Sequence, residues 1–67
     1  MIEIEDDFIV LRHTEHPNLC YDIPLRFLKV YEDVDFWCNH LEEKEWVDAE
    51  LISLFYTLAN SWVSKNT

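Results

Sequence analysis

The sequence of 67 residues contains no glycine, and this absence excludes one class of chemistry. Loops that hold phosphate groups against the backbone need positions that glycine adopts without steric penalty. Neither a Walker-type phosphate loop nor a dinucleotide-binding fingerprint can be written with these residues. Nucleotide-dependent catalysis is therefore not expected.

Basic residues are also scarce. The chain has five Lys and Arg residues and 14 Asp and Glu residues, which gives a net charge of −9. Such a surface repels DNA, RNA and anionic membranes, so direct binding to any of them is not expected. A basic protein surface is the expected partner, including one on a protein that itself binds nucleic acid.

Long hydrophobic runs are missing as well. The longest apolar stretches, Phe8–Leu11 and Leu54–Tyr56, are far too short to cross a membrane. The first seven residues lack the basic start and apolar run of a signal peptide. The two cysteines, Cys20 and Cys38, are therefore expected to be reduced in a cytosol, and the predicted location is cytoplasmic.

Hydrophobic residues, by contrast, make up 49% of the chain. They are enough for the core of one small domain over residues 1–67. A domain of this size buries only about 60% of the surface that its unfolded chain exposes. It would gain stability from a partner surface. A homodimer and a complex with another protein are the two alternatives.

The first part of the sequence predicts extended structure. Residues 2–12 are rich in strand formers, with an interruption at Asp6–Asp7 that indicates a bulge or a turn. Residues 13–18 predict a hairpin connection, and residues 19–23 predict a second strand that ends at Pro24. Residues 25–31 fit either a short helical turn or a continued strand. We favour a connecting segment packed on the core.

The second part predicts two helices. The first has Asp33 as its N-cap, carries an apolar stripe and runs to about Lys44. The second begins after Trp46 with Asp48 as its cap. The predicted fold is α+β, a ββαα domain in which an antiparallel β-hairpin packs on a two-helix hairpin. The stripes consist of Val34, Trp37, Cys38 and Leu41 in the first helix, and of Leu51, Phe55, Leu58 and Trp62, widened by Ile52, Ala59 and Val63, in the second.

Two surfaces are candidates for binding a partner. One is the outer face of the second helix, which is almost uncharged and includes Tyr56; an ordinary polar face is the alternative. The other is the acidic turn between the helices, where carboxylates could occupy the basic groove of a nucleic-acid-binding protein, or could serve only helix capping and solubility. The candidate partner-binding residues are Glu42, Glu43, Glu45, Trp46, Asp48, Glu50 and Tyr56.

Metal binding and catalysis have weaker support. The pairs His13 and His16, and Cys38 and His40, could supply zinc ligands, but their spacing matches no compact zinc motif. Cys38 lies on a stripe that predicts burial, which makes it inert as a nucleophile. No cofactor is expected, and the chain is not expected to be an enzyme.

In size, in acidity and in its lack of catalytic motifs, the chain resembles the small acidic proteins of phages and mobile elements, some of which mimic nucleic acid and block restriction or CRISPR enzymes. The resemblance implies an inhibitor or regulator that docks acidic residues on a basic protein. The alternative is a homodimeric adaptor or structural protein that associates through hydrophobic surface. The third hypothesis is a metal-binding module.

Overall fold

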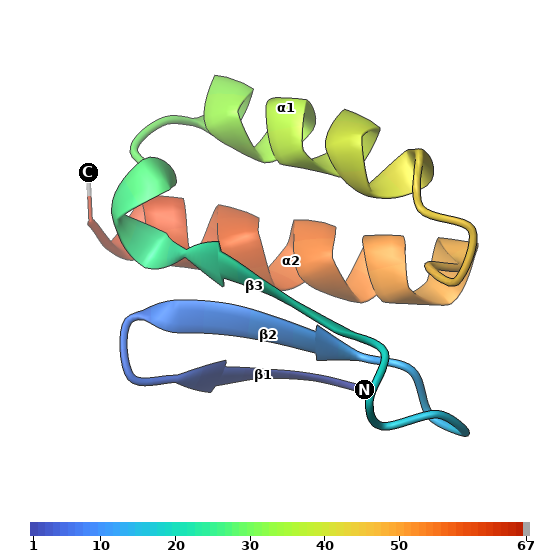
Figure 1. Ribbon diagram of the computed structural model, residues 1–67. Helices are drawn as coiled ribbons and strands as arrows, with labels where there is room; N and C mark the ends of the chain where they lie inside the picture. Colours follow the sequence, from blue (N-terminus) through green and yellow to red (C-terminus); the bar gives the residue numbers. More distant parts are fainter. Residues whose placement is uncertain (67) are drawn as a thin grey trace.

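The computed structural model describes residues 1–66, in which three strands are followed by two helices (Figure 1). The predicted α+β class, with the strands first and the helix pair second, is confirmed. The predicted domain ends at Thr67, which lies outside the described residues. The elements are β1 (Ile2–Glu5), β2 (Phe8–Arg12), β3 (Cys20–Pro24), a short 3-10 helix η1 (Leu25–Phe27), α1 (Tyr31–Glu42) and α2 (Ala49–Lys65).

The sheet has three antiparallel strands in the order β1-β2-β3, where the sequence predicted a two-stranded hairpin. The difference lies at Asp6–Asp7, which forms a turn between two strands and not a bulge within one. Glu5 pairs with Phe8 on either side of it. Asp6 has a φ of 53°, in the left-handed region. Aspartate tolerates this region better than most residues, and the chain offers no glycine for the position.

One face of this sheet packs against the helix pair (Figure 1). Ile9 and Leu11 of β2 and Ile23 of β3 point toward the helices and are fully buried. Residues between them point to the outer face, because side chains alternate along a strand. Val10, on that outer face, pairs with Glu3 and with Asp22. Charged residues therefore flank the apolar centre of the outer face.

The helices contribute the predicted stripes to the core. Val34 and Leu41 of α1 are buried, as are Leu51, Phe55, Ala59 and Val63 of α2. Trp37, Cys38 and Trp62, predicted as core residues, are only half-buried and pack around the margin of the core. The connection after β3 packs on the core as predicted, through buried Leu25 and Leu28. It begins with the short helical turn η1, one of the two conformations that the sequence left open, and Tyr31 already belongs to α1.

The start of α1 corrects the sequence prediction. The helix begins at Tyr31 and its N-cap is Val30, so Asp33 is not the cap. Asp33 lies in the first turn, and its Oδ2 accepts hydrogen bonds from the backbone N–H groups of Lys29 (2.9 Å) and Val30 (3.2 Å). The carboxylate still satisfies amide groups at the helix start, but from inside the helix. The helix ends at Glu42, two residues before Lys44.

The start of α2 is as predicted. Asp48 is the N-cap, and its Oδ1 accepts a hydrogen bond of 2.8 Å from the backbone N–H of Leu51. Glu50 lies in the first turn, where the positive end of the helix dipole favours a carboxylate. These two acidic residues therefore have a role in folding.

Candidate partner-binding surfaces

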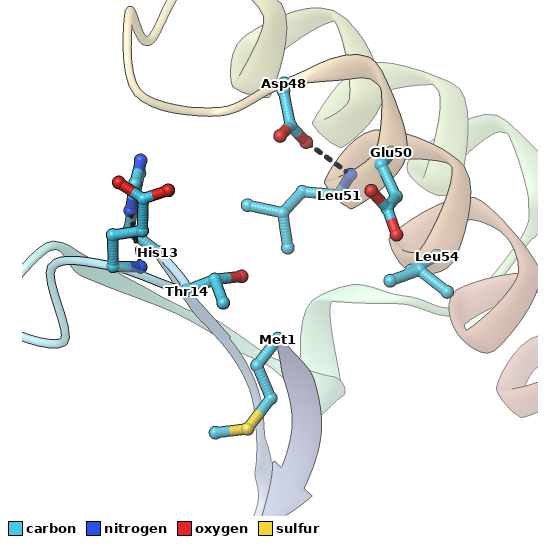
Figure 2. A pocket seen from close by; sticks show the side chains of 8 residues that line it. Met1, His13, Thr14, Asp48, Glu50, Leu51 and Leu54 are labelled. Atoms are coloured by element: carbon cyan, nitrogen blue, oxygen red, sulfur yellow. Dashed lines mark hydrogen bonds between the residues drawn. The ribbon is translucent and has the colours of Figure 1, made fainter.

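Two segments that are far apart in the sequence, the α1–α2 turn and the β2–β3 loop, lie at the same end of the molecule (Figure 1). Between the loop and the start of α2 lies a hollow of about 320 Å³. Figure 2 shows Asp48 and Glu50 at the start of α2, and His13 and Thr14 on the loop, around this hollow. Glu15, from the same loop, also lines it. The fold thus adds a loop carboxylate to the predicted acidic turn.

The loop is shaped by His13. Its ring Nδ1 accepts hydrogen bonds from the backbone N–H groups of Glu15 (3.1 Å) and His16 (3.2 Å). An imidazole nitrogen accepts a hydrogen bond through its ring lone pair, and here two backbone amides share that of Nδ1. The rings of His13 and His16 lie side by side, with their centroids 5.0 Å apart. This histidine therefore holds the loop, and with it Glu15, in place.

The α1–α2 turn carries the remaining carboxylates of this end. Glu42, Glu43 and Glu45 are exposed. The neighbouring Lys44 turns toward the sheet, where its Nζ lies 4.2 Å from the centre of the Tyr21 ring. We call the set of acidic residues at this end of the molecule the acidic end. It consists of Glu15, Glu42, Glu43, Glu45, Asp48 and Glu50.

Most acidic residues of the protein have no partner within residues 1–66. The ion pairs there join Arg12 to Glu3 (3.5 Å) and to Glu5 (2.7 Å). Asp33 and Asp48 accept backbone hydrogen bonds. The other ten of the 14 acidic side chains make no hydrogen bond or ion pair within the described part of the chain. The charge of the surface is therefore largely unneutralised.

The structure separates two predicted site residues from this group. Trp46 is half-buried and packs against the core, which limits its use as a contact residue. Tyr56 is 49% exposed, but it lies on α2 eight residues beyond Asp48, or about 12 Å along the helix axis. The acidic turn and the outer face of α2 are therefore distinct surfaces.

A cluster of aromatic rings on β3, η1 and α1 was not predicted as a site. Phe27 stacks on Trp37 with ring centroids 6.4 Å apart, and Phe36 meets the same indole edge-on at 5.5 Å. Phe36 is 63% exposed and Phe27 is 49% exposed. We call this cluster the ring face. It consists of Tyr21, Phe27, Phe36, Trp37 and His40.

The ring face is assembled by tertiary contacts. His40 Nε2 lies 3.1 Å from the hydroxyl oxygen of Tyr21, which joins α1 to β3 by a hydrogen bond. Phe36 is the one member that the sequence pattern could have signalled, because it falls off the apolar stripe of α1 as a large exposed ring. The others come together only when η1 and β3 pack beside α1.

The cysteines and histidines do not converge. Within residues 1–66, no three His, Cys, Asp or Glu side chains are placed to share a metal ion. Burial raises the pKa of the Cys38 thiol, and the nearby carboxylates of Asp35 and Glu42 raise it further. The thiol is therefore held in its protonated and less nucleophilic form. Cys20 is exposed on β3, and both cysteines are free.

No known family model, curated protein or solved structure matches this chain. Within residues 1–66, neither helix combines the length and the apolar character that crossing a membrane requires.

Proposed function

We propose that this protein is a non-enzymatic inhibitor or regulator whose acidic end binds a basic surface of a nucleic-acid-binding protein. The observation that carries the proposal is the placement of Glu42 and Glu43 at the C-terminal end of α1. The helix dipole disfavours a carboxylate there. Both side chains are exposed and unpaired within the described residues, so folding gives no reason for them.

The physical basis of such binding is electrostatic. Carboxylates at the acidic end would take the place of phosphates in the basic groove of the partner. Long-range attraction would speed association, and dissolved salt would weaken it. The non-enzymatic part of the proposal is supported by Cys38, whose thiol is held protonated, and by His13, whose Nδ1 is occupied by backbone amides. The proposal includes a cytoplasmic location, supported by the two unpaired cysteines.

The test compares two triple variants that each remove three negative charges. Glu42→Gln, Glu43→Gln and Glu45→Gln neutralise the acidic end, whereas Asp6→Asn, Asp7→Asn and Asp22→Asn neutralise exposed carboxylates elsewhere. Each protein is used to capture partners from cells of its source at 50 and 500 mM salt. We expect the wild type and the second variant to retain a nucleic-acid-binding protein at low salt only, and the first variant to lose it.

A further step tests inhibition. The captured partner is mixed with labelled duplex DNA, and the wild-type protein is expected to displace the DNA as its concentration rises. Capture that is equal for the two triple variants, or that persists at high salt, would show that the acidic end is not the contact.

A second candidate function is self-association as a homodimeric adaptor, and the ring face favours it. Phe27, Phe36 and also Tyr31, at the start of α1, expose large rings on neighbouring elements. Aromatic residues of this kind are enriched at binding hot spots. Sedimentation at low and high salt tests it: a dimer that is insensitive to salt and is lost in Phe36→Ser supports this function, and a monomer at both salt concentrations contradicts it.

A further inference from the structure

Strand β1 forms one edge of the sheet (Figure 1). Half of the backbone groups of an antiparallel edge strand face away from its neighbour. Met1 and Arg12 exchange two hydrogen bonds of 2.8 Å, so they form a bonded pair. Because bonded and non-bonded pairs alternate in an antiparallel ladder, Glu3 also bonds to β2. The N–H and C=O groups of Ile2 and Ile4 therefore point outward from the sheet.

The opposite edge, at β3, is a poorer template for pairing. The bonds from His13 N to Leu19 O (2.9 Å) and from Leu25 N to Asp7 O (2.8 Å) set the same alternation there. The outward positions of β3 are therefore Cys20, Asp22 and Pro24. Proline has no N–H to donate, and natural proteins use it to protect an edge from pairing. Strand β1 contains no proline, so the backbone N–H groups of both Ile2 and Ile4 are able to donate.

An open apolar groove runs beside this free edge, between β1 and α2. Its volume is about 560 Å³. Ile4 is 44% exposed and Leu54 is 43% exposed along it. A strand added next to β1 would direct every second side chain into this groove, because side chains alternate across a sheet. The groove is lined by Ile2, Glu3, Ile4, Leu54, Thr57, Leu58 and Ser61.

The intervening side chains of an added strand would meet negative charge. They would lie beside Glu3 and Glu5 on the outer face of the sheet, where Asp22 also lies. Arg12 contacts both glutamates, so one positive charge is shared between two negative ones. A net negative charge remains on this face, and it complements Lys or Arg.

A second copy of the chain fits this edge poorly. The symmetric antiparallel register that bonds both Ile2 and Ile4 of each copy sets Glu3 directly opposite Glu3 of the other copy. Like charges placed directly opposite one another destabilise a strand pair.

We propose that β1 binds an extended segment of a partner protein in which apolar residues alternate with Lys or Arg. The segment pairs with the backbone of Ile2 and Ile4, places its apolar side chains in the groove beside Leu54, and sets its basic side chains against Glu3 and Glu5. This inference goes beyond the proposed function and does not rest on it, because the acidic end contributes no residue to the groove.

The probe is a fluorescent seven-residue peptide in which Val and Lys alternate, titrated into the protein and followed by anisotropy. A peptide of the same composition with the valines grouped together, and a peptide in which Val alternates with Glu, are the controls. We expect saturable binding of the alternating Val and Lys peptide only. Equal binding of the grouped peptide, or no binding of the alternating one, would overturn the proposal.

Backbone pairing has its own signature. N-methylation removes one peptide N–H at a time, and in a strand only every second N–H faces the neighbouring strand. We expect methylation to abolish binding at alternate positions and to leave it unchanged at the positions between them. Equal sensitivity at all positions would mean that the peptide binds by charge and apolar contact without joining the sheet.

Variants locate the site on the protein. Glu3→Lys is expected to weaken binding of the peptide in which Val and Lys alternate about tenfold. The same variant is expected to bind the peptide in which Val and Glu alternate. Leu54→Lys, in the groove, is expected to weaken the first peptide, while Tyr56→Ser, on a different flank of α2, is the matched control and should not. Circular dichroism confirms that each variant is folded.

Two further outcomes separate this site from other surfaces. The triple variant at Glu42, Glu43 and Glu45 should bind the peptide as the wild type does. If this variant loses binding, the peptide binds at the acidic end and not at β1. A dimer of the wild type that Glu3→Lys or Leu54→Lys dissociates would place a second copy on the β1 edge. Either result would overturn the proposal.

Discussion

The acidic end and the ring face differ in what they do for the fold. Within the ring face, Tyr21 and Trp37 pack on the margin of the core. Trp37 also contacts the rings of Phe27 and Phe36. The carboxylates of Glu42, Glu43 and Glu45 contact no cation within residues 1–66, and two of them lie at the unfavourable end of a helix dipole. The packed rings therefore add to stability, whereas Glu42 and Glu43 of the acidic end oppose it.

This difference decides how each region is interpreted. Folding already accounts for much of the ring face, because half-buried aromatic side chains supply apolar area to a small domain. Folding does not account for Glu42 and Glu43. We therefore base the proposed function on the acidic end and leave the ring face to the second candidate. Substitutions that separate stability from binding test this division.

The largest effect is expected from Phe55→Ala, because Phe55 of α2 is fully buried in the hydrophobic core. The loss of a buried ring should lower the free energy of unfolding by about 4 kcal/mol, which is most of the stability of a domain this small. Urea denaturation measures it. The matched control is the adjacent Tyr56→Ala, which should change stability by less than about 0.5 kcal/mol. Equal losses of unfolding free energy in the two variants would show that Phe55 is not a core residue.

Trp37→Ala tests whether the ring face is structural. The indole is half-buried and contacts four other rings, so we expect a loss of about 2 kcal/mol in the same assay. Phe36→Ala removes an exposed ring of the same cluster and should lower stability much less. If Trp37→Ala leaves stability unchanged, the ring face has no structural role and the comparison fails.

Asp48→Ala tests a carboxylate of the acidic end that serves folding. Loss of the N-cap bond to Leu51 should lower the free energy of unfolding by about 1 kcal/mol. Asp35→Ala, which removes an exposed carboxylate from α1, is the control and should not destabilise. A neutral result for Asp48→Ala would mean that this residue, like Glu43, is free for binding alone.

Glu43→Lys should stabilise the protein. It replaces a negative charge with a positive one at the C-terminal end of α1 and reduces the repulsion among the carboxylates. We expect a gain of about 0.5 kcal/mol at low salt. The gain should shrink in 0.5 M salt because the charge is exposed. A loss of stability would show that Glu43 takes part in folding after all.

The smallest effect concerns Cys38. Its pKa is raised in the folded protein, so the folded state keeps the thiol proton to a higher pH than the unfolded chain does. The resulting stabilisation is fully present below the pKa of the unfolded thiol and is lost as the pH rises through the folded value. Wild type should therefore lose more stability than Cys38→Ala between pH 7 and pH 10. Cys20→Ala should behave as the wild type does.

Much of the fold was predictable from local patterns. The stripe of Leu51, Phe55 and Val63 and the cap at Asp48 predicted α2 correctly, because burial of one face and capping both act within a few residues. The start of α1 was not predicted correctly, since Asp33 can accept hydrogen bonds from backbone amides either as the N-cap or from the first turn of the helix. Composition alone does not distinguish these two arrangements.

The candidate surfaces were predictable only in part. The carboxylates from Glu42 to Glu50 are close in sequence, so their grouping at one turn follows from the two helices. Glu15 joins them through the position of the β2–β3 loop. The ring face and the groove beside β1 each combine residues from separate elements, and no periodicity within one element predicts them.

The sequence by itself determined the class of fold, the excess of negative charge and the lack of glycine, because all three depend on composition or on short-range pattern. Tertiary structure decided that Asp6–Asp7 divides a predicted strand into two. It thereby left β1 at a free edge and set Ile4 beside Leu54 of α2. Strand pairing and packing are non-local, so the surfaces that they create exist only in the folded chain.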